Sequence, residues 1–210
     1  MKKLTALILA CMFVLSALTA CGGAGTPAGS GETDAIVAGF KTIGDVLAYP
    51  GTNEEQYAAQ DEKFIYVFSL NGTYYRGITE MSDEESSKLF NLDYDDPEHD
   101  AKEAALLAPV KVDNWENLSK LIPPQEELDK LVGKTGQELL DDGWTSGGYN
   151  LNEKEFWMNK GPFSYTVVMD GLEIGDDFDY DSFNEDETLP TLTVKSVTFT
   201  GLGDAASLED

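Results

Sequence analysis

The chain has 210 residues and a formal net charge of −25 at pH 7, with 39 acidic and 14 basic side chains. This acid excess argues against nucleic acid as a partner and against contact between the folded body and anionic lipid, because both surfaces would repel it. Hydrophobic residues make up 41% of the chain, with ten Phe, nine Tyr and three Trp, so a packed body is expected and a disordered one is not.

The first residues predict an export signal. Two lysines precede an almost wholly apolar run from Leu4 to Leu18, which is too short and wrongly flanked for a membrane-spanning helix. The run ends in Leu18-Thr19-Ala20-Cys21, which resembles the bacterial lipobox. The resemblance implies signal cleavage between Ala20 and Cys21 and a diacylglyceryl group on the sulfur of Cys21. The alternative is an ordinary secretory signal with a chance cysteine.

This signal predicts how the mature protein is held. Two acyl chains on one sulfur would anchor it stably to the extracytoplasmic face of the cell membrane, with no other membrane contact. Removal of residues 1–20, which carry two lysines and no acid, leaves 190 residues with a charge of −27. Cys21 would then be the only cysteine, which excludes an internal disulfide and a free catalytic thiol. Residues 21–33 are mostly Gly, Ala, Ser, Thr and Pro and predict a flexible tether.

Residues 34–122 predict a first α+β unit. Asn71-Gly72 is a strong hairpin signal, and the strand before it is apolar on both faces, so we expect that strand to be covered on both sides. Ser82 and Thr42 are good helix N-caps. The expected elements are a helical turn over 34–39, a helix over 42–47, strands over 64–70 and 73–79, helices over 82–92 and 101–107, and a strand over 110–115.

Residues 123–203 predict a second α+β unit, followed by a loose tail over 204–210. Thr135 and Glu138 form a capping box at the start of a helix. The apolar residues of the last strand change from one face to the other partway along it, which predicts a β-bulge near Lys195 or Ser196. The expected elements are a helix over 125–132, a turn-rich loop over 144–150, strands over 155–159 and 163–169, an acidic loop over 172–187 and a strand over 191–199.

A repeated pattern relates the two halves. Lys41-Thr42-x-x-Asp45-Val46-Leu47 recurs 93 residues later as Lys134-Thr135-x-x-Glu138-Leu139-Leu140, and the order of the surrounding elements recurs as well. The repeat predicts two tandem units, each with short helices packed on one face of an antiparallel sheet.

This arrangement resembles the β-lactamase inhibitor protein fold, in which two such units stand side by side, and it is similar to small envelope lipoproteins of the outer-membrane assembly type. The whole chain resembles a family of uncharacterised gut Firmicute lipoproteins. The segments Leu131–Leu140 and Gly161–Val167 carry this resemblance. The inhibitor likeness implies inhibition of a secreted hydrolase. Those inhibitors carry disulfides, however, which the mature chain here could not form internally.

Two acidic segments are candidates for a metal or catalytic site. His99, the only histidine, lacks an evident nucleophile or further nitrogen or sulfur ligands, so we expect an exposed loop residue. Asp176–Asp181 alternates carboxylates like the start of a calcium loop, but Ser182 and Thr188 occupy the positions that require Gly and Glu. Weak calcium binding by either loop is the alternative to a solvated acidic loop.

Three aromatic residues, Trp144, Tyr149 and Trp157, could line a binding face, and the alternative is that they belong to the core or cover a sheet. The sequence contains no nucleophile elbow, zinc motif or dinucleotide fingerprint, so no catalytic, cofactor-binding or metal-binding residue is predicted. The predicted function is that of a lipid-anchored, non-catalytic protein that binds an envelope or extracellular component through a sheet face. The alternatives are a hydrolase inhibitor and a weak calcium-binding module.

Overall fold

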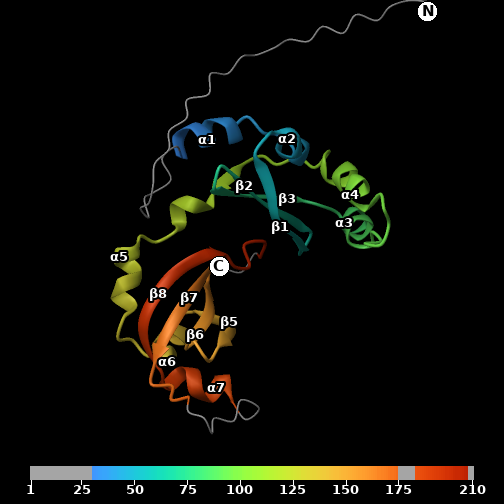
Figure 1. The fold of residues 1–210 in the computed structure, drawn as a ribbon. Coiled ribbons are helices and arrows are strands. Elements are labelled where there is room, and N and C mark those ends of the chain that lie inside the picture. The colour runs from blue at the N-terminus through green and yellow to red at the C-terminus, as the bar shows by residue number, and fades with distance from the viewer. Residues whose placement is uncertain (1–29, 175–182, 208–210) are drawn as a thin grey trace, which may run out of the picture.

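The computed structural model describes residues 30–174 and 183–207. Within these ranges the chain forms two four-stranded antiparallel sheets, each with short helices beside it (Figure 1). This confirms the predicted α+β class with two tandem units. The predicted cleavage site at Ala20 and Cys21, most of the predicted tether and the acidic segment Asp176–Asp181 lie outside the described residues.

The first sheet has the strand order β1-β2-β3-β4. The first unit contains α1 (Ser30–Val37), α2 (Ile43–Ala48), β1 (Thr52–Gln60), β2 (Lys63–Leu70), β3 (Thr73–Glu80), α3 (Asp83–Phe90), α4 (His99–Leu107), β4 (Trp115–Asn117) and the 3₁₀ turn η1 (Leu118–Leu121).

The second sheet has the strand order β5-β6-β7-β8. The second unit contains α5 (Gln125–Leu128), η2 (Asp129–Leu131), α6 (Gly136–Asp141), β5 (Thr145–Asn150), β6 (Glu155–Lys160), β7 (Phe163–Asp170), α7 (Glu185–Thr188), η4 (Leu189–Thr191) and β8 (Thr193–Leu202).

The predicted helix starts are confirmed. Thr42, Ser82 and Thr135 each accept a hydrogen bond from the backbone three residues later, and the acidic side chain at that third position bonds back to the cap. These reciprocal bonds satisfy amide groups that the first helical turn leaves without partners. The predicted hairpin around Asn71-Gly72 and the predicted bulge at Lys195 are present as well, since Ser196 pairs with Val168 and Val194 with Met169.

Several element predictions were wrong. Helix α1 begins at Ser30, so the last four residues of the predicted tether are helical. Strand β1 was missed, because its sequence is polar and its turn to β2 uses Asp61 and Glu62 at positive φ, where Asn-Gly would be expected. Of the predicted strand over 110–115, only Lys111 forms an isolated bridge, and the short strand β4 begins at Trp115. The predicted loop over 144–150 is strand β5.

The repeat is reproduced in three dimensions. The carbonyl oxygen of Lys41 accepts a hydrogen bond from the amide of Val112 at 3.0 Å, and that of Lys134 accepts one from Val194 at 2.8 Å. Each of the two caps, Thr42 and Thr135, also forms an isolated antiparallel bridge to a later segment of its own unit. The two units therefore position their repeated helices by the same backbone bonds.

Strand β2 is buried on both faces, as predicted, from Phe64 to Leu70. One face packs under helices of the first unit, which lie on the outer side of the sheet in Figure 1. Ile65 and Val67 on the other face belong to the core of the second unit. The two units thus share one hydrophobic cluster across their boundary.

The segment after β8 completes this boundary, so the predicted loose tail is wrong for residues 204–207. Gln56 on β1 donates a side-chain hydrogen bond to the carbonyl of Gly203 at 2.6 Å and accepts one from the amide of Ala205 at 3.0 Å. Ala205 and Ala206 are buried. A single glutamine therefore fixes the end of the second unit against the edge of the first sheet.

Candidate functional site

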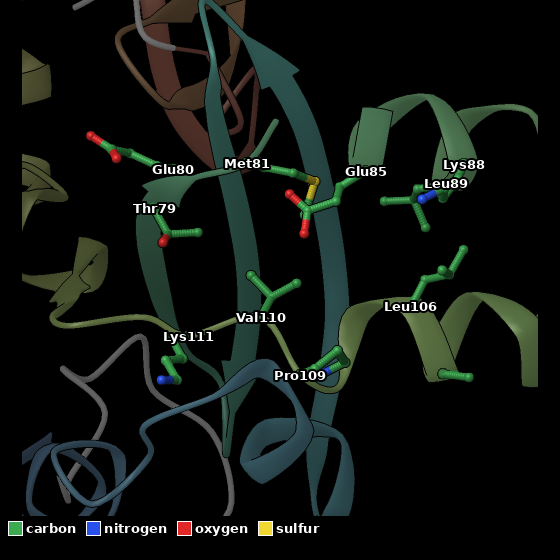
Figure 2. Close-up of a pocket in the computed structure, with 11 residues that line it drawn as sticks. Thr79, Glu80, Met81, Glu85, Lys88, Leu89, Leu106, Pro109, Val110 and Lys111 are labelled. Carbon is green, nitrogen blue, oxygen red and sulfur yellow. The ribbon is translucent and has the colours of Figure 1, made fainter. Parts of the chain in front are cut away.

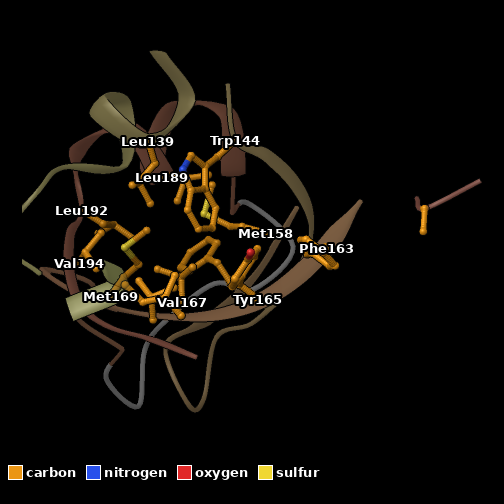
Figure 3. Close-up of a cluster of buried hydrophobic side chains, with 14 of the residues drawn as sticks. Leu139, Trp144, Met158, Phe163, Tyr165, Val167, Met169, Leu189, Leu192 and Val194 are labelled. Atoms are coloured by element: carbon orange, nitrogen blue, oxygen red, sulfur yellow. The ribbon is translucent and has the colours of Figure 1, made fainter. Parts of the chain in front are cut away.

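The second sheet has one buried face and one open face. Along β7, Phe163, Tyr165, Val167 and Met169 are buried, and the residues between them are only partly buried. Figure 3 shows Met158, Tyr165 and Met169 pointing from the strands toward Leu139 and Leu189, which cover this inner face. The opposite side of the sheet is the candidate functional surface, because no side chain on its paired positions is buried.

The centre of the open face is a row of four residues that cross the sheet in register. Gly148 on β5 pairs with Trp157 on β6, Trp157 pairs with Thr166 on β7, and Thr166 pairs with Thr198 on β8. Directly opposed residues in antiparallel strands share a face, so these four positions point outward together.

Two further rows flank the central one. Asn150, Glu155, Val168 and Ser196 pair across the sheet on one side of it. Thr145, Asn159, Ser164 and Gly201 pair across it on the other. We call these twelve positions the docking face. Seven of them carry neutral hydrogen-bonding side chains, and one, Glu155, carries a charge. Beside them on the same face, Asp170 and the bulged Lys195 form an exposed ion pair at 3.8 Å.

Trp157 dominates the docking face. Its side chain is 48% exposed, although an indole is large and mostly apolar. A Cβ atom on Gly148 would lie 3.1 Å from Cε3 of the indole, so the glycine allows the ring to approach the edge strand. The pairing of β5 with β6 shifts between Ser146 and Gly148, and this bulge sets Gly148 beside the ring.

The three aromatic residues singled out from the sequence do not form one surface. Trp144 is buried in the core of the second unit. Tyr149 pairs with Phe156 on the inner face, and its ring centroid lies 4.8 Å from that of Phe183. Only Trp157 lies on the docking face. Its hydroxyl neighbours Thr166 and Thr198 were not singled out, although polar Ser164 and Thr166 alternate with the aromatic residues of β7 and so indicated the face of Thr166.

The expectation of an exposed loop for His99 was wrong. His99 is the first residue of α4, and its side chain is only 13% exposed. Its ring stacks on Tyr94 with centroids 4.7 Å apart, and its Nδ1 lies 3.2 Å from the carboxylate of Asp100. The ligand atoms of His99, Asp100 and Glu103 lie within 4.8 Å of one another, so this trio could hold a metal ion.

Glu103, the partly buried carboxylate of this trio, already has a hydrogen-bond partner. Tyr57 donates a hydrogen bond to Glu103, and Tyr66 donates one to Glu54 at 2.8 Å. Partial burial, with a smaller contribution from the charge of Glu103, raises the pKa of Glu54 above its usual range. Burial raises the pKa of both tyrosines, and the nearby carboxylates raise it further, so both hydroxyls stay protonated as donors.

A surface groove lies between β3, α3 and α4, with a volume of about 470 Å³ (Figure 2). Met81, Leu106 and Val110 contribute apolar lining, and Lys88 and Glu85 contribute charge. It holds no paired nucleophile and base among its lining residues.

A second surface cavity lies beside α1, where Asp34 attaches this helix to the first sheet. The Asp34 carboxylate accepts hydrogen bonds from Lys120 Nζ at 2.6 Å, Asn117 Nδ2 at 2.6 Å and the Tyr75 hydroxyl at 3.0 Å. The bonds from Lys120 and Asn117, with a smaller one from Tyr75, hold the pKa of Asp34 below its usual value of 3.8. Burial raises the pKa of Tyr75 to about 12, so Tyr75 remains a donor.

Asp34→Asn is expected to lower the free energy of unfolding by about 1–3 kcal/mol at pH 7, because hydrogen bonds to a charged acceptor are lost. A carboxyl whose pKa is lower in the folded state stabilises the fold above its usual pKa and loses this effect as the pH falls. Urea denaturation should therefore show a difference that shrinks below about pH 4. Asp113→Asn, an exposed residue on the same cavity, is the control. A difference that stays constant with pH would contradict this role of Asp34.

No protein-family model, curated protein or solved structure matches the chain. Among the described residues, no helix has the length and apolar character needed to cross a membrane.

Proposed function

We propose that the chain is a lipid-anchored extracytoplasmic protein that binds an envelope or extracellular component through the docking face and does not catalyse a reaction. The observation that carries this proposal is the half-exposed indole of Trp157 at the centre of an open sheet face whose paired positions carry mostly neutral hydrogen-bonding side chains. Exposed aromatic side chains surrounded by polar groups are typical of binding surfaces.

The way the sheet faces are used in packing supports this assignment. Both faces of β2 and the inner face of the second sheet are used for packing. The docking face contributes no residue to either hydrophobic cluster. The side chains of its central row are therefore free to change without loss of the core, as expected of a surface used for recognition.

The anchor is tested by growth with labelled palmitate. The wild-type chain should carry label on Cys21 and fractionate with membranes, and Cys21→Ser should carry no label and either keep its signal segment or be released in soluble form. Label on the serine variant, or an unlabelled wild-type protein, would contradict the anchor.

Binding is tested with residues 22–210, which include both hydrophobic clusters and so should fold without the anchor. The fluorescently labelled body is added to intact cells of the bacterium that produces it. Saturable binding is expected, and Trp157→Ala should weaken it at least about tenfold, as for a residue central to an interface. Val132→Ala, at an exposed position away from the docking face, should not. Binding that does not depend on Trp157 would overturn the assignment of the face.

A further inference from the structure

His99 and Glu103 present two metal-ligating side chains on one face of helix α4. They lie four residues apart, which places their side chains one turn apart on the same side of the helix. Asp100 adds a third ligand, and one ligand atom from each of the three residues lies within 4.8 Å of the others. A histidine nitrogen combined with carboxylate oxygens is a donor set that binds zinc in proteins. The trio thus differs from an acidic surface cluster, which offers oxygen alone.

The spacing of the ligand atoms is close to that of a zinc site. Zinc binds nitrogen and carboxylate oxygen at about 2.0–2.2 Å in a tetrahedron, so neighbouring ligand atoms lie about 3.4 Å apart. Nδ1 of His99 and Oδ1 of Asp100 lie 3.2 Å apart, which already matches this separation. The carboxylate of Asp100 is fully exposed, so it can turn toward an ion without disturbing the core. Three protein ligands leave the fourth position of the tetrahedron to water.

Neighbouring side chains already hold two of the three ligands in place. The ring of His99 stacks on Tyr94 with centroids 4.7 Å apart. Glu103 accepts a hydrogen bond from the hydroxyl of Tyr57 on β1. An ionised carboxylate has further lone pairs, so this bond leaves Glu103 able to bind a metal ion. Hydrogen bonds of this kind orient the ligating carboxylates of metal sites.

The charges around the trio favour a cation, and this observation is independent of the ligand spacing. Partial burial and, to a smaller degree, the charge of Glu103 raise the pKa of Glu54 on β1, so these two carboxylates lie near each other. Among the described residues, neither of them forms an ion pair with a basic side chain. Residues 93–103 carry six acidic side chains and one lysine, Lys102, whose amine pairs with two acids outside the trio. A divalent ion at the trio would supply the missing positive charge.

We propose that His99, Asp100 and Glu103 bind one zinc ion, with water as the fourth ligand. The ion joins the first turn of α4 to β1, because Glu103 is also bonded to Tyr57 on that strand. Its role is therefore structural, in holding α4 against the edge of the first sheet. Imidazole nitrogen favours zinc over calcium, which takes six or more oxygen ligands. The inference does not depend on the proposed function, since the docking face belongs to the second sheet.

The test is a titration of zinc chloride into residues 22–210, purified without a histidine tag. This body lacks the Cys21 thiol, which would itself bind zinc. His99 is the only histidine in the chain, so its ring resonances in NMR report on this site alone. We expect one ion per chain by calorimetry, saturating shifts of the His99 ring resonances, and a melting temperature that rises with zinc concentration. Calcium chloride at the same concentrations should leave the ring resonances unchanged.

Four substitutions separate ligation from charge. His99→Gln and Glu103→Gln should raise the zinc dissociation constant at least about tenfold, because even the loss of an outer hydrogen bond to a metal ligand costs about 10–100-fold. Asp100→Asn changes a fully exposed side chain, so it should fold and should weaken binding even if the other two variants are unstable. Asp95→Asn removes the same charge from an exposed position outside the trio and should change the dissociation constant less than about twofold.

The outcomes decide between a zinc site and general attraction of cations to the acidic segment. Zinc binding that His99→Gln leaves unchanged would overturn the inference, and so would ring resonances of His99 that do not respond to excess zinc. Equal weakening by Asp95→Asn and Asp100→Asn would show attraction without coordination. Displacement of zinc from the ring by an equal concentration of calcium would contradict the proposed choice of ion. Binding to cells through Trp157 is measured separately, so failure here leaves the proposed function standing.

Discussion

Ile65→Asp is expected to prevent the chain from reaching its native fold. Ile65 is fully buried on the face of β2 that belongs to the core of the second unit. A carboxylate there would have to be desolvated without a partner or protonated, and substitutions of this kind cost more than about 4 kcal/mol. That is comparable to the whole stability of many domains, which is about 5–15 kcal/mol. Circular dichroism and limited proteolysis should show an unfolded or partly folded chain.

Ile78→Asp is the matched control for this prediction. Ile78 lies directly opposite Ile65 in the β2–β3 pairing and on the same face, but it is 42% exposed. We expect it to change the free energy of unfolding by less than about 1 kcal/mol, as surface substitutions usually do. If both variants folded equally well, the second unit would not cover this face of β2, and the shared core would be wrong.

Gly136→Ala is expected to be the most damaging loss of a single glycine in the second unit. A Cβ at this position would lie 2.0 Å from the carbonyl oxygen of Leu189, which is backbone and cannot rotate away. Helix α6 would have to move from η4, and the core around Leu139 would open. We expect a loss of more than about 3 kcal/mol in urea denaturation.

Gly31→Ala is its control, because nothing lies within 4 Å of the added Cβ and the residue is exposed in α1. Alanine is favoured over glycine inside a helix by about 0.5–1 kcal/mol, so this variant should be neutral or slightly stabilised. Equal effects of the two substitutions would show that the close contact at Gly136 does not constrain the fold.

Local chemistry explains which elements could be predicted from the sequence. The caps at Thr42, Ser82 and Thr135 and the Asn71-Gly72 turn act within a few residues, so their signals can be read directly. Strand β1 carries no such signal, because most of its residues are polar and it is held by pairing with β2 and by side-chain bonds to residues far away in the sequence. The docked tail likewise depends on Gln56, which lies about 150 positions earlier in the chain.

The candidate site was predicted only in part, for the same reason. Trp157 could be singled out because a tryptophan is conspicuous in any sequence. Its grouping with Thr166 and Thr198 depends on the registers of two strand pairs, one of which contains bulges. Trp144 and Tyr149 are near Trp157 in sequence, but burial and the opposite strand face separate them from it.

The most direct test of the docking face is photo-crosslinking of the anchored protein in living cells. A photoreactive residue is placed at Thr198, on the docking face, or at Lys130, an exposed position on η2. We predict a crosslinked product from position 198 that disappears when Trp157→Ala is added, and none that depends on Trp157 from position 130. Crosslinking from position 130 alone, or from position 198 regardless of Trp157, would contradict the assignment of this face.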